Sequence, residues 1–251
     1  MGSGLKERID QLLVDRGLAN SRKSALSLVM SGLVIADGEK ISKAGSMVEK
    51  TAEIRLTGKV IPYVGRGGIK LEAALGSFFI DPKGMAAMDV GSSTGGFTDC
   101  LLKMGARKVY AIDVGYGLLA WSLRTDPRVV ILERKNIREM EREEIGEEID
   151  IATVDLSFIS LKKAIPKVFS FLRDGGIVLA LIKPQFEVEK GEVGRGGIIR
   201  EEEKRDGVVE DMISFVRGLG LIVAGVTASS ILGRKGNKEY FMCLRKSGGE
   251  I

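Results

Sequence analysis

Apolar residues recur at helical spacing at the beginning of this 251-residue chain. Residues 5–13 place leucine and isoleucine every three to four positions, a period typical of an amphipathic helix, and Gly17 offers a stop for it. A second helix is expected to end at Gly32. Its N-terminal cap is expected to be Asn20 or Ser21, because short polar side chains accept hydrogen bonds from the free backbone N–H groups there. The pattern therefore predicts two short helices in succession.

A strand-like pattern follows these helices. Residues 33–41 predict a hairpin that turns at Asp37-Gly38, a pair that favours a tight turn between antiparallel strands. Residues 48–56 are expected to form one further strand. Two helices and a small sheet predict a compact α+β module over residues 1–58, and the glycine-rich stretch over residues 59–69 predicts a linker.

From residue 70 to residue 251, helical patterns alternate with apolar runs that are typical of buried strands. A short helix is expected over residues 70–79. Strands are expected near residues 86–90, 108–113, 128–132, 149–155, 176–183, 221–228 and 238–245. Such alternation predicts an α/β domain with a mostly parallel sheet covered on both faces. The connection between the last two strands is too short for a parallel crossover, so these strands should run antiparallel.

Composition narrows the possible chemistry. The chain has no histidine, which excludes an imidazole base and zinc sites that need one. Cys100 and Cys243 offer neither a metal-ligand spacing nor a disulfide framework, so we expect no metal. We also expect a cytoplasmic protein without a membrane partner, because no apolar run approaches the roughly 18 residues that span a bilayer and the N-terminus lacks an apolar signal region. The net charge of +4 favours a polyanionic partner only weakly.

The stretch over residues 85–99 carries a ligand-binding pattern. An apolar run ends in Asp89, breaks at Gly91 and continues through further small residues into a helix. Glycine tolerates positive φ and lets the backbone approach a ligand closely, and the free N–H groups of a helix start face the bound group. We therefore expect a ligand on this turn. The alternative is a turn whose glycines serve only the chain geometry.

A second strand-like run ends in Asp113, about twenty residues after the turn, the spacing at which a carboxylate meets a ribose hydroxyl in dinucleotide-binding folds. The turn lacks the Gly-x-Gly-x-x-Gly phosphate pattern, so a pyrophosphate is the less favoured ligand. S-adenosylmethionine fits better, because it has an adenosine and an amino-acid end but no phosphate.

Basic residues are dense in the first module, and Arg22 and Lys23 open its second helix, where backbone donors can also face phosphate. The segments KERIDQLL (6–13), SRKSA (21–25) and GLVIADG (32–38) resemble an S4 RNA-binding domain. The alternative is a solvated basic surface. The residues expected to contact RNA are Lys6, Arg8, Arg22, Lys23, Lys40 and, in the linker, Arg66.

Charged residues end two of the expected buried strands, Asp155 and Lys183. Open α/β sheets bind ligands outside the carboxyl ends of their strands. A charge at the end of a buried strand is costly unless it is paired, so we expect these two side chains to face each other. Lys70 and Glu239, each taken alone, are typical of ordinary surface charges.

The segments VGRGGIKLE (64–72), DVGSSTGGFTD (89–99), DLSFIS (155–160) and LIKPQFE (181–187) together resemble the TlyA family. These are S4-containing ribosomal RNA 2′-O-methyltransferases with an FtsJ-like catalytic domain. The resemblance implies a Rossmann-like methyltransferase sheet with an antiparallel last strand. It also implies a catalytic tetrad of Lys70, Asp155, Lys183 and Glu239. One departure is Gly65, where the family often has serine.

The same resemblance implies how S-adenosylmethionine is bound. The turn over residues 91–97 would hold the methionine part, Asp113 the ribose, and Asn136, after the third strand, the adenine. The cofactor contacts implied in full are Asp89, Gly91, Ser92, Ser93, Thr94, Gly95, Gly96, Phe97, Asp113, Asn136 and Asp155.

We therefore expect methyl transfer to a ribose 2′-hydroxyl of ribosomal RNA, with a cytidine as the nucleotide and ribosomal RNA or a ribosomal subunit as the partner. Lys183 would act as base or orienting donor, aligned by Asp155. A nicotinamide-dependent oxidoreductase accounts only for the glycine turn. A pore-forming haemolysin would need an exposed apolar helix or lipid-facing strands, and the pattern shows neither. The loop over residues 191–197 either closes over RNA or is only a long connection. The sequence leaves the oligomeric state open, a monomer included.

Overall fold

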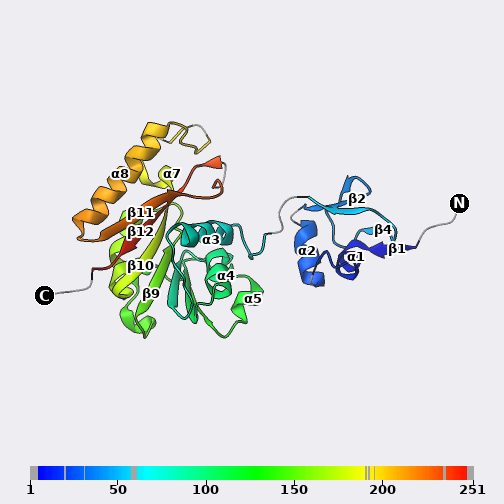
Figure 1. Cartoon of the computed structure of the whole chain (residues 1–251), viewed down its shortest axis with the longest axis horizontal. Helices are drawn as coiled ribbons and strands as arrows, with labels where there is room; N and C mark the ends of the chain where they lie inside the picture. Colours follow the sequence, from blue (N-terminus) through cyan, green and yellow to red (C-terminus); the bar gives the residue numbers. More distant parts are fainter. Residues whose placement is uncertain are drawn as a thin grey trace. The chain divides into compact units, whose positions relative to one another are not determined.

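The computed structural model describes residues 5–19, 21–30, 32–57, 61–189, 191, 193–194, 196–233 and 236–247. Its contacts divide the chain into two compact units, Met1–Val60 and Ile61–Ile251 (Figure 1). The boundary falls inside the stretch expected to be a linker. Residues 61–69 belong to the second unit, and its first helix, α3, already begins at Gly67.

The described residues of the first unit form two short helices and two small antiparallel sheets. Its elements are β1 (Lys6–Arg8), α1 (Ile9–Asp15), α2 (Arg22–Met30), β2 (Val34–Ala36), β3 (Glu39–Lys40), β4 (Met47–Glu49) and β5 (Ile54–Leu56). Strand β1 pairs with β4, and β2 lies between β3 and β5. The expected hairpin is confirmed as β2 and β3. The backbone N–H of Ser24 donates to Ser21 Oγ at 3.2 Å, which confirms Ser21 as a cap of α2.

Two expectations for this unit are wrong. Helix α1 begins at Ile9 rather than near Leu5, because the intervening residues pair with β4 as a strand. The single strand expected over residues 48–56 is divided into β4 and β5. The Arg16 guanidinium donates to the carbonyl oxygens of Lys50 and Ala52, both at 2.6 Å, and thereby holds the turn that separates the two strands.

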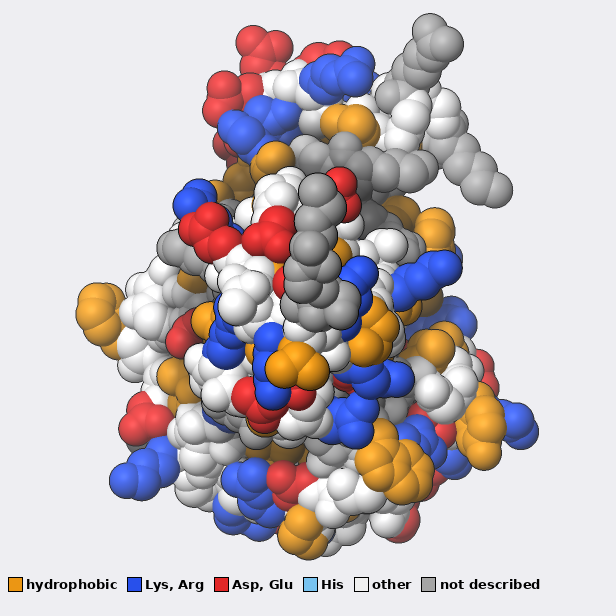
Figure 2. Space-filling view, turned by 90° about the vertical axis from the view of Figure 1, so that its right-hand side faces the viewer, with side chains coloured by type: hydrophobic (Ala, Val, Ile, Leu, Met, Phe, Trp, Pro, Cys, Tyr) orange, Lys and Arg blue, Asp and Glu red, His pale blue; other side chains and the backbone are white. Residues whose placement is uncertain are grey.

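A buried carboxylate links the two helices of the first unit. Asp10, only 6% exposed, accepts hydrogen bonds from Arg8 Nη2 at 2.8 Å and from Arg22 Nη2 at 3.2 Å. The bond from Arg8 holds the pKa of Asp10 at about 2, well below its usual range. Part of the positive charge of two expected RNA-binding residues is therefore balanced within the unit. Figure 2 shows that positive and negative side chains are also mixed over the surface drawn there, with Lys and Arg interspersed among Asp and Glu.

The second unit is built on a seven-stranded sheet with the order β11-β12-β10-β9-β6-β7-β8. The strands are β6 (Ala86–Val90), β7 (Lys108–Asp113), β8 (Val129–Glu133), β9 (Ile149–Val154), β10 (Leu172–Ile182), β11 (Ile222–Ala228) and β12 (Tyr240–Arg245). Neighbours from β8 through β10 pair in parallel, and β12 runs antiparallel to both β10 and β11. The expected antiparallel ending is confirmed.

Helices cover both faces of this sheet, as the alternating pattern predicted (Figure 1). One face carries α3 (Gly67–Ser77), α4 (Gly96–Lys103) and α5 (Trp121–Arg124); the other carries α6 (Ile165–Phe171), α8 (Glu202–Gly218) and the 3-10 helices Ile137–Glu139, Arg142–Glu144 and Leu161–Lys163. The short helix α7 (Pro184–Glu187) follows β10. Side chains alternate along β6, with Met88 packing into one core and Ala87 into the other. No helix among the described residues is long and apolar enough to cross a membrane.

The turn between β6 and α4 requires glycine for steric reasons. Gly91 has φ +86°, and a Cβ there would lie 2.4 Å from the carbonyl oxygen of Asp155. Gly95 has φ +93°, and a Cβ there would lie 2.2 Å from Leu123 Cδ1. Only glycine accommodates both the left-handed backbone and these close approaches. The turn thus brings the end of β6 into direct contact with the end of β9.

We expect the Asp10→Asn substitution to lower stability at neutral pH, because a neutral amide cannot pair with two arginines. A depressed carboxyl pKa contributes stability above its unfolded value of about 3.9, and this contribution is lost as pH falls through about 2. The difference in unfolding free energy between wild type and variant should therefore narrow from pH 4 to pH 2. Urea unfolding followed by far-UV circular dichroism measures it. Fluorescence of the single tryptophan, Trp121, follows the second unit alone and is the control. An equal difference in unfolding free energy at pH 7 and at pH 2 would contradict the low pKa of Asp10.

We expect Gly91→Ala to lower the melting temperature more than Gly84→Ala does. Both glycines have positive φ, but a Cβ at Gly84 meets nothing within 4 Å. Gly84→Ala should therefore cost only the roughly 1–2 kcal/mol of a left-handed L-residue. The clash with the Asp155 carbonyl should add about 1–3 kcal/mol at Gly91. Differential scanning calorimetry of both variants measures the difference, and equal melting temperatures would show that the contact is not tight.

Candidate active site

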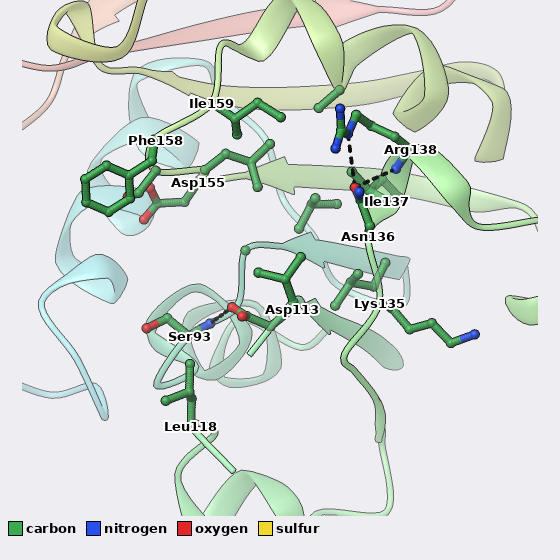
Figure 3. A pocket seen from close by; sticks show the side chains of 17 residues that line it. Ser93, Asp113, Leu118, Lys135, Asn136, Ile137, Arg138, Asp155, Phe158 and Ile159 are labelled. Atoms are coloured by element: carbon green, nitrogen blue, oxygen red, sulfur yellow. Dashed lines mark hydrogen bonds between the residues drawn. The ribbon is translucent and has the colours of Figure 1, made fainter. Parts of the chain in front are cut away.

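A hollow of about 430 Å³ opens at the carboxyl ends of β6, β7 and β9 (Figure 3). This volume lies in the range of small-molecule sites. Asp113 and Ser93 line one side, and Asp155 and Phe158 line another. The residues that line it are Val90, Gly91, Ser93, Ile112, Asp113, Val114, Leu118, Lys135, Asn136, Ile137, Arg138, Asp155, Leu156, Ser157, Phe158, Ile159 and Ala164.

Asp113 is the last residue of β7 and holds the glycine turn in place. Its Oδ2 accepts from the backbone N–H of Ser93 at 2.8 Å, and its Oδ1 accepts from the backbone N–H of Gly115 at 2.7 Å. Ser93 has φ +49°, an uncommon conformation for a residue with a side chain. The carboxylate therefore fixes the two loops between which it lies, and it faces the hollow.

Asn136 lines the same hollow from the loop after β8. Its Nδ2 donates to Glu139 Oε1 at 2.8 Å, and its Oδ1 accepts from the backbone N–H of Arg138 at 3.3 Å. Ile112 and Ile137 provide apolar surface beside it. This side of the hollow combines an apolar lining with an amide that hydrogen bonds hold in one orientation.

A smaller hollow of about 180 Å³ lies between the glycine turn and the start of α3. Its lining residues are Gly67, Gly91, Ser92, Ser93, Thr94, Gly96, Phe97 and Asp155. The backbones of α3 and α4 approach so closely that a Cβ at Gly96 would lie 3.0 Å from the backbone nitrogen of Gly68. A Cβ at Gly65 would lie 2.9 Å from Thr94 Oγ1, so the departure from serine at this position leaves room for Thr94.

Asp89 and Gly95 line neither of these two hollows, although both were expected to contact the cofactor. Asp89 is fully buried and accepts from Thr98 Oγ1 at 2.6 Å and from Thr153 Oγ1 at 3.1 Å. Burial raises its pKa to about 7 against the effect of these hydrogen bonds. The carboxyl group ties β6 to α4 and β9, and Gly95 provides the left-handed residue before α4. Both residues therefore support the conformation of the turn and do not line either hollow.

Asp155 and Lys183 face each other at the ends of β9 and β10, as expected. Lys183 Nζ lies 2.5 Å from Asp155 Oδ1, and the lysine is 9% exposed. Lys183 Nζ also donates to Ser157 Oγ at 3.0 Å. Asp155 lines both hollows, so this ion pair stands where they meet.

Lys70 and Glu239 form a second buried ion pair, at 2.5 Å. Lys70 lies on α3, and Glu239 immediately precedes β12, with side chains 11% and 3% exposed. A Cβ at Gly233 would lie 1.9 Å from Glu239 Oε1, so the hairpin backbone packs directly against the carboxylate. Removing one member of such a pair leaves a buried charge uncompensated.

Of the residues expected to contact RNA, Lys6, Arg8, Arg22 and Lys40 are exposed on the first unit. Arg66 is exposed on the second unit, and its Nη2 donates to the carbonyl oxygen of Leu232 at 3.1 Å. The side chain of Lys23 lies outside the described residues. So do Glu192 and Arg195 in the loop over residues 191–197.

Three residues of the site were not singled out from the sequence. Phe158 is 90% exposed with φ +64°, and its ring lies 5.0 Å from that of Phe186. Glu187 accepts from Ser160 Oγ at 2.5 Å and from the backbone N–H of Leu161, and burial raises its pKa. Ser157 contacts Lys183. All three lie in the segments DLSFIS and LIKPQFE, so their position in these motifs was the available signal.

Comparison with known proteins gives matches over both units. The family description "FtsJ-like methyltransferase" matches residues 63–246, and "S4 domain" matches residues 7–54. The chain is 44% identical to the 16S/23S rRNA (cytidine-2′-O)-methyltransferase TlyA of Mycobacterium tuberculosis (strain ATCC 25618 / H37Rv), over 96% of this chain and 90% of the relative. It is 41% identical to Hemolysin A of Brachyspira hyodysenteriae, over 93% and 97% respectively.

A solved structure of a hemolysin candidate from Streptococcus thermophilus matches with a TM-score of 0.76 and 41% identity, over 98% of this chain and 90% of that one. Relatives thus match nearly the whole chain, and the two family descriptions divide it as the two compact units do. The chain belongs to the TlyA family, in which an S4 domain precedes an FtsJ-like methyltransferase domain.

Proposed function

We propose that this protein transfers a methyl group from S-adenosylmethionine to the 2′-hydroxyl of a cytidine in ribosomal RNA. The observation that carries the proposal is the Lys183–Asp155 ion pair at the junction of two hollows, one of them large enough for a nucleoside. The name of the Mycobacterium tuberculosis relative supports the reaction and the nucleotide. A ribosomal RNA substrate places the activity in the cytoplasm. Membership of a methyltransferase family disfavours the nicotinamide-dependent oxidoreductase.

The hollow fits the chemistry of the cofactor. In the larger hollow, the Asp113 carboxylate would accept from ribose hydroxyls, and Asn136 with Ile112 and Ile137 would hold the adenine. In the smaller hollow, the backbone of Ser92, Ser93 and Thr94 would hold the amino-acid end. When bound, the cofactor supplies an electrophilic methyl group on a positively charged sulfonium.

The ion pairs would act on the ribose hydroxyl. Its oxygen must lose a proton as it attacks, so a group within hydrogen-bond reach must accept or orient that proton. Lys183 is our candidate for this group, because it forms an ion pair with Asp155, which lines both hollows. Lys70 and Glu239 would complete the network from α3 and the last hairpin.

The two units would divide the work. The first unit would bind RNA through Lys6, Arg8, Arg22, Lys23 and Lys40, with Arg66 contributing from the second. Arg8 and Arg22 share the Asp10 carboxylate, so each presents a fixed guanidinium rather than a freely moving one. Such phosphate contacts position the substrate without reading its sequence.

The proposed function is tested by incubating the protein with unmodified ribosomal RNA and methyl-labelled S-adenosylmethionine and mapping the 2′-O-methylated positions. We expect labelled cytidine with the wild type and a rate about 10²–10⁴-fold lower with Lys183→Ala, the range for a positioned proton acceptor. Lys167→Ala is the matched control, because Lys167 forms its ion pair with Glu141 on another part of the surface. Calorimetry should show unchanged cofactor affinity in all three proteins. Wild-type rates for Lys183→Ala would refute its assigned role, and a label on a base would refute the reaction.

We expect Asp113→Ala to raise the dissociation constant for S-adenosylmethionine about 10- to 100-fold, since a charge-assisted hydrogen bond contributes roughly 1.5–3 kcal/mol. Asp174→Ala, which removes a largely exposed aspartate at the beginning of β10, is the control. Isothermal titration calorimetry measures both, and thermal unfolding checks that the turn remains folded. Unchanged affinity would leave Asp113 with only its structural contacts to Ser93 and Gly115.

A further inference from the structure

Lys183 has a second oxygen partner besides its carboxylate. Its Nζ lies 2.5 Å from Asp155 Oδ1 and 3.0 Å from Ser157 Oγ, and Ser157 also lines the larger hollow. The mechanism proposed above uses the aspartate alone. Because the lysine is 9% exposed, the contacts that its nitrogen makes within the protein decide how the nitrogen is oriented.

The nitrogen of a lysine side chain has three bonding directions besides its carbon. Ser157 Oγ accepts a hydrogen bond along one of them, at 3.0 Å. Asp155 Oδ1, two residues earlier on the same loop, is an ion-pair partner at 2.5 Å, but this contact lacks the geometry of a hydrogen bond and does not set a direction. The hydrogen bond to Ser157 therefore decides how the other two directions are turned, one of which can meet a substrate oxygen.

The loop that carries Ser157 is held at both ends. At its beginning, the backbone N–H of Asp155 donates to the carbonyl oxygen of Val90 at 2.9 Å. At its end, Glu187 accepts from Ser160 Oγ at 2.5 Å and from the backbone N–H of Leu161 at 2.9 Å. The next residue after Ser157 takes a left-handed conformation, with φ +64° at Phe158. A strained residue persists only where surrounding contacts determine it.

We propose that Ser157 is a positioning residue, whose hydroxyl orients Lys183 Nζ so that one of its free directions faces the ribose 2′-oxygen. This rests on the role proposed for Lys183. Ser157 does not need to touch the substrate. Its hydroxyl oxygen accepts a hydrogen bond from the lysine and leaves the ion pair with Asp155 intact.

The test compares single-turnover methylation of ribosomal RNA at saturating cofactor and RNA. Ser157→Ala should lower the rate of methyl transfer about 10- to 100-fold, the order of effect of misplacing a reacting group. The dissociation constants for S-adenosylmethionine and for RNA should remain those of the wild type. Ser157→Thr retains the hydroxyl and should restore most of the rate.

Ser160→Ala is the matched control, because Ser160 lies on the same loop and its hydroxyl donates to Glu187 instead. If Ser160→Ala lowers the rate of methyl transfer as much as Ser157→Ala does, only loop stability matters, and the proposal is overturned. A rate unchanged by Ser157→Ala, or not restored by threonine, would overturn it as well.

A double substitution separates this inference from the proposed function. In the Lys183→Ala background, Ser157→Ala should have no further effect, because the hydroxyl acts through the lysine. If Lys183→Ala alone keeps the wild-type rate, the proposed role of the lysine fails. If Lys183→Ala is inactive but Ser157→Ala is fully active, only the positioning role fails.

Discussion

The ion pair between Lys183 and Asp155 constrains the whole catalytic unit. Two charges stand at the ends of adjacent buried strands, 2.5 Å apart, where leaving either one alone would be costly. Their separation is set by the parallel register of β9 and β10. The pair therefore lies at the edge of the sheet to which the glycine turn, the loop after β9 and helix α7 are all attached.

Close backbone packing holds the glycine turn against that edge. Gly91 lies against the Asp155 carbonyl oxygen without room for a Cβ, and the buried carboxyl group of Asp89 ties β6 to α4 and β9. Burial raises the pKa of this carboxyl group to about 7, because placing it away from water costs free energy. Its hydrogen bonds to two threonines offset part of that cost and keep the turn rigid. Rigidity here matters because the turn lines both hollows.

The first unit shows the same principle on a smaller scale. Asp10 is nearly buried and fixes Arg8 and Arg22, which belong to different elements. The unit thereby exposes guanidinium groups in set positions while balancing part of their charge. Such ordered donors would suit the phosphate contacts proposed for this unit, because they lose less conformational freedom on binding.

The sequence by itself determined the order of the strands in the second unit and the antiparallel ending of its sheet, and it indicated two units. These features rest on local periodicity and connection length, which neighbouring residues decide. It also indicated that Asp155 and Lys183 would meet, because strand ends of a parallel sheet share one edge. Only the tertiary structure decided where β4 ends and β5 begins, since Arg16, the residue that follows α1, holds that turn although it lies more than 30 residues earlier in the chain. It likewise placed Asp89 behind the turn, paired Lys70 with Glu239 and brought Ser157 to Lys183. These contacts join residues far apart in the chain or depend on the path of a loop, and no local pattern records either.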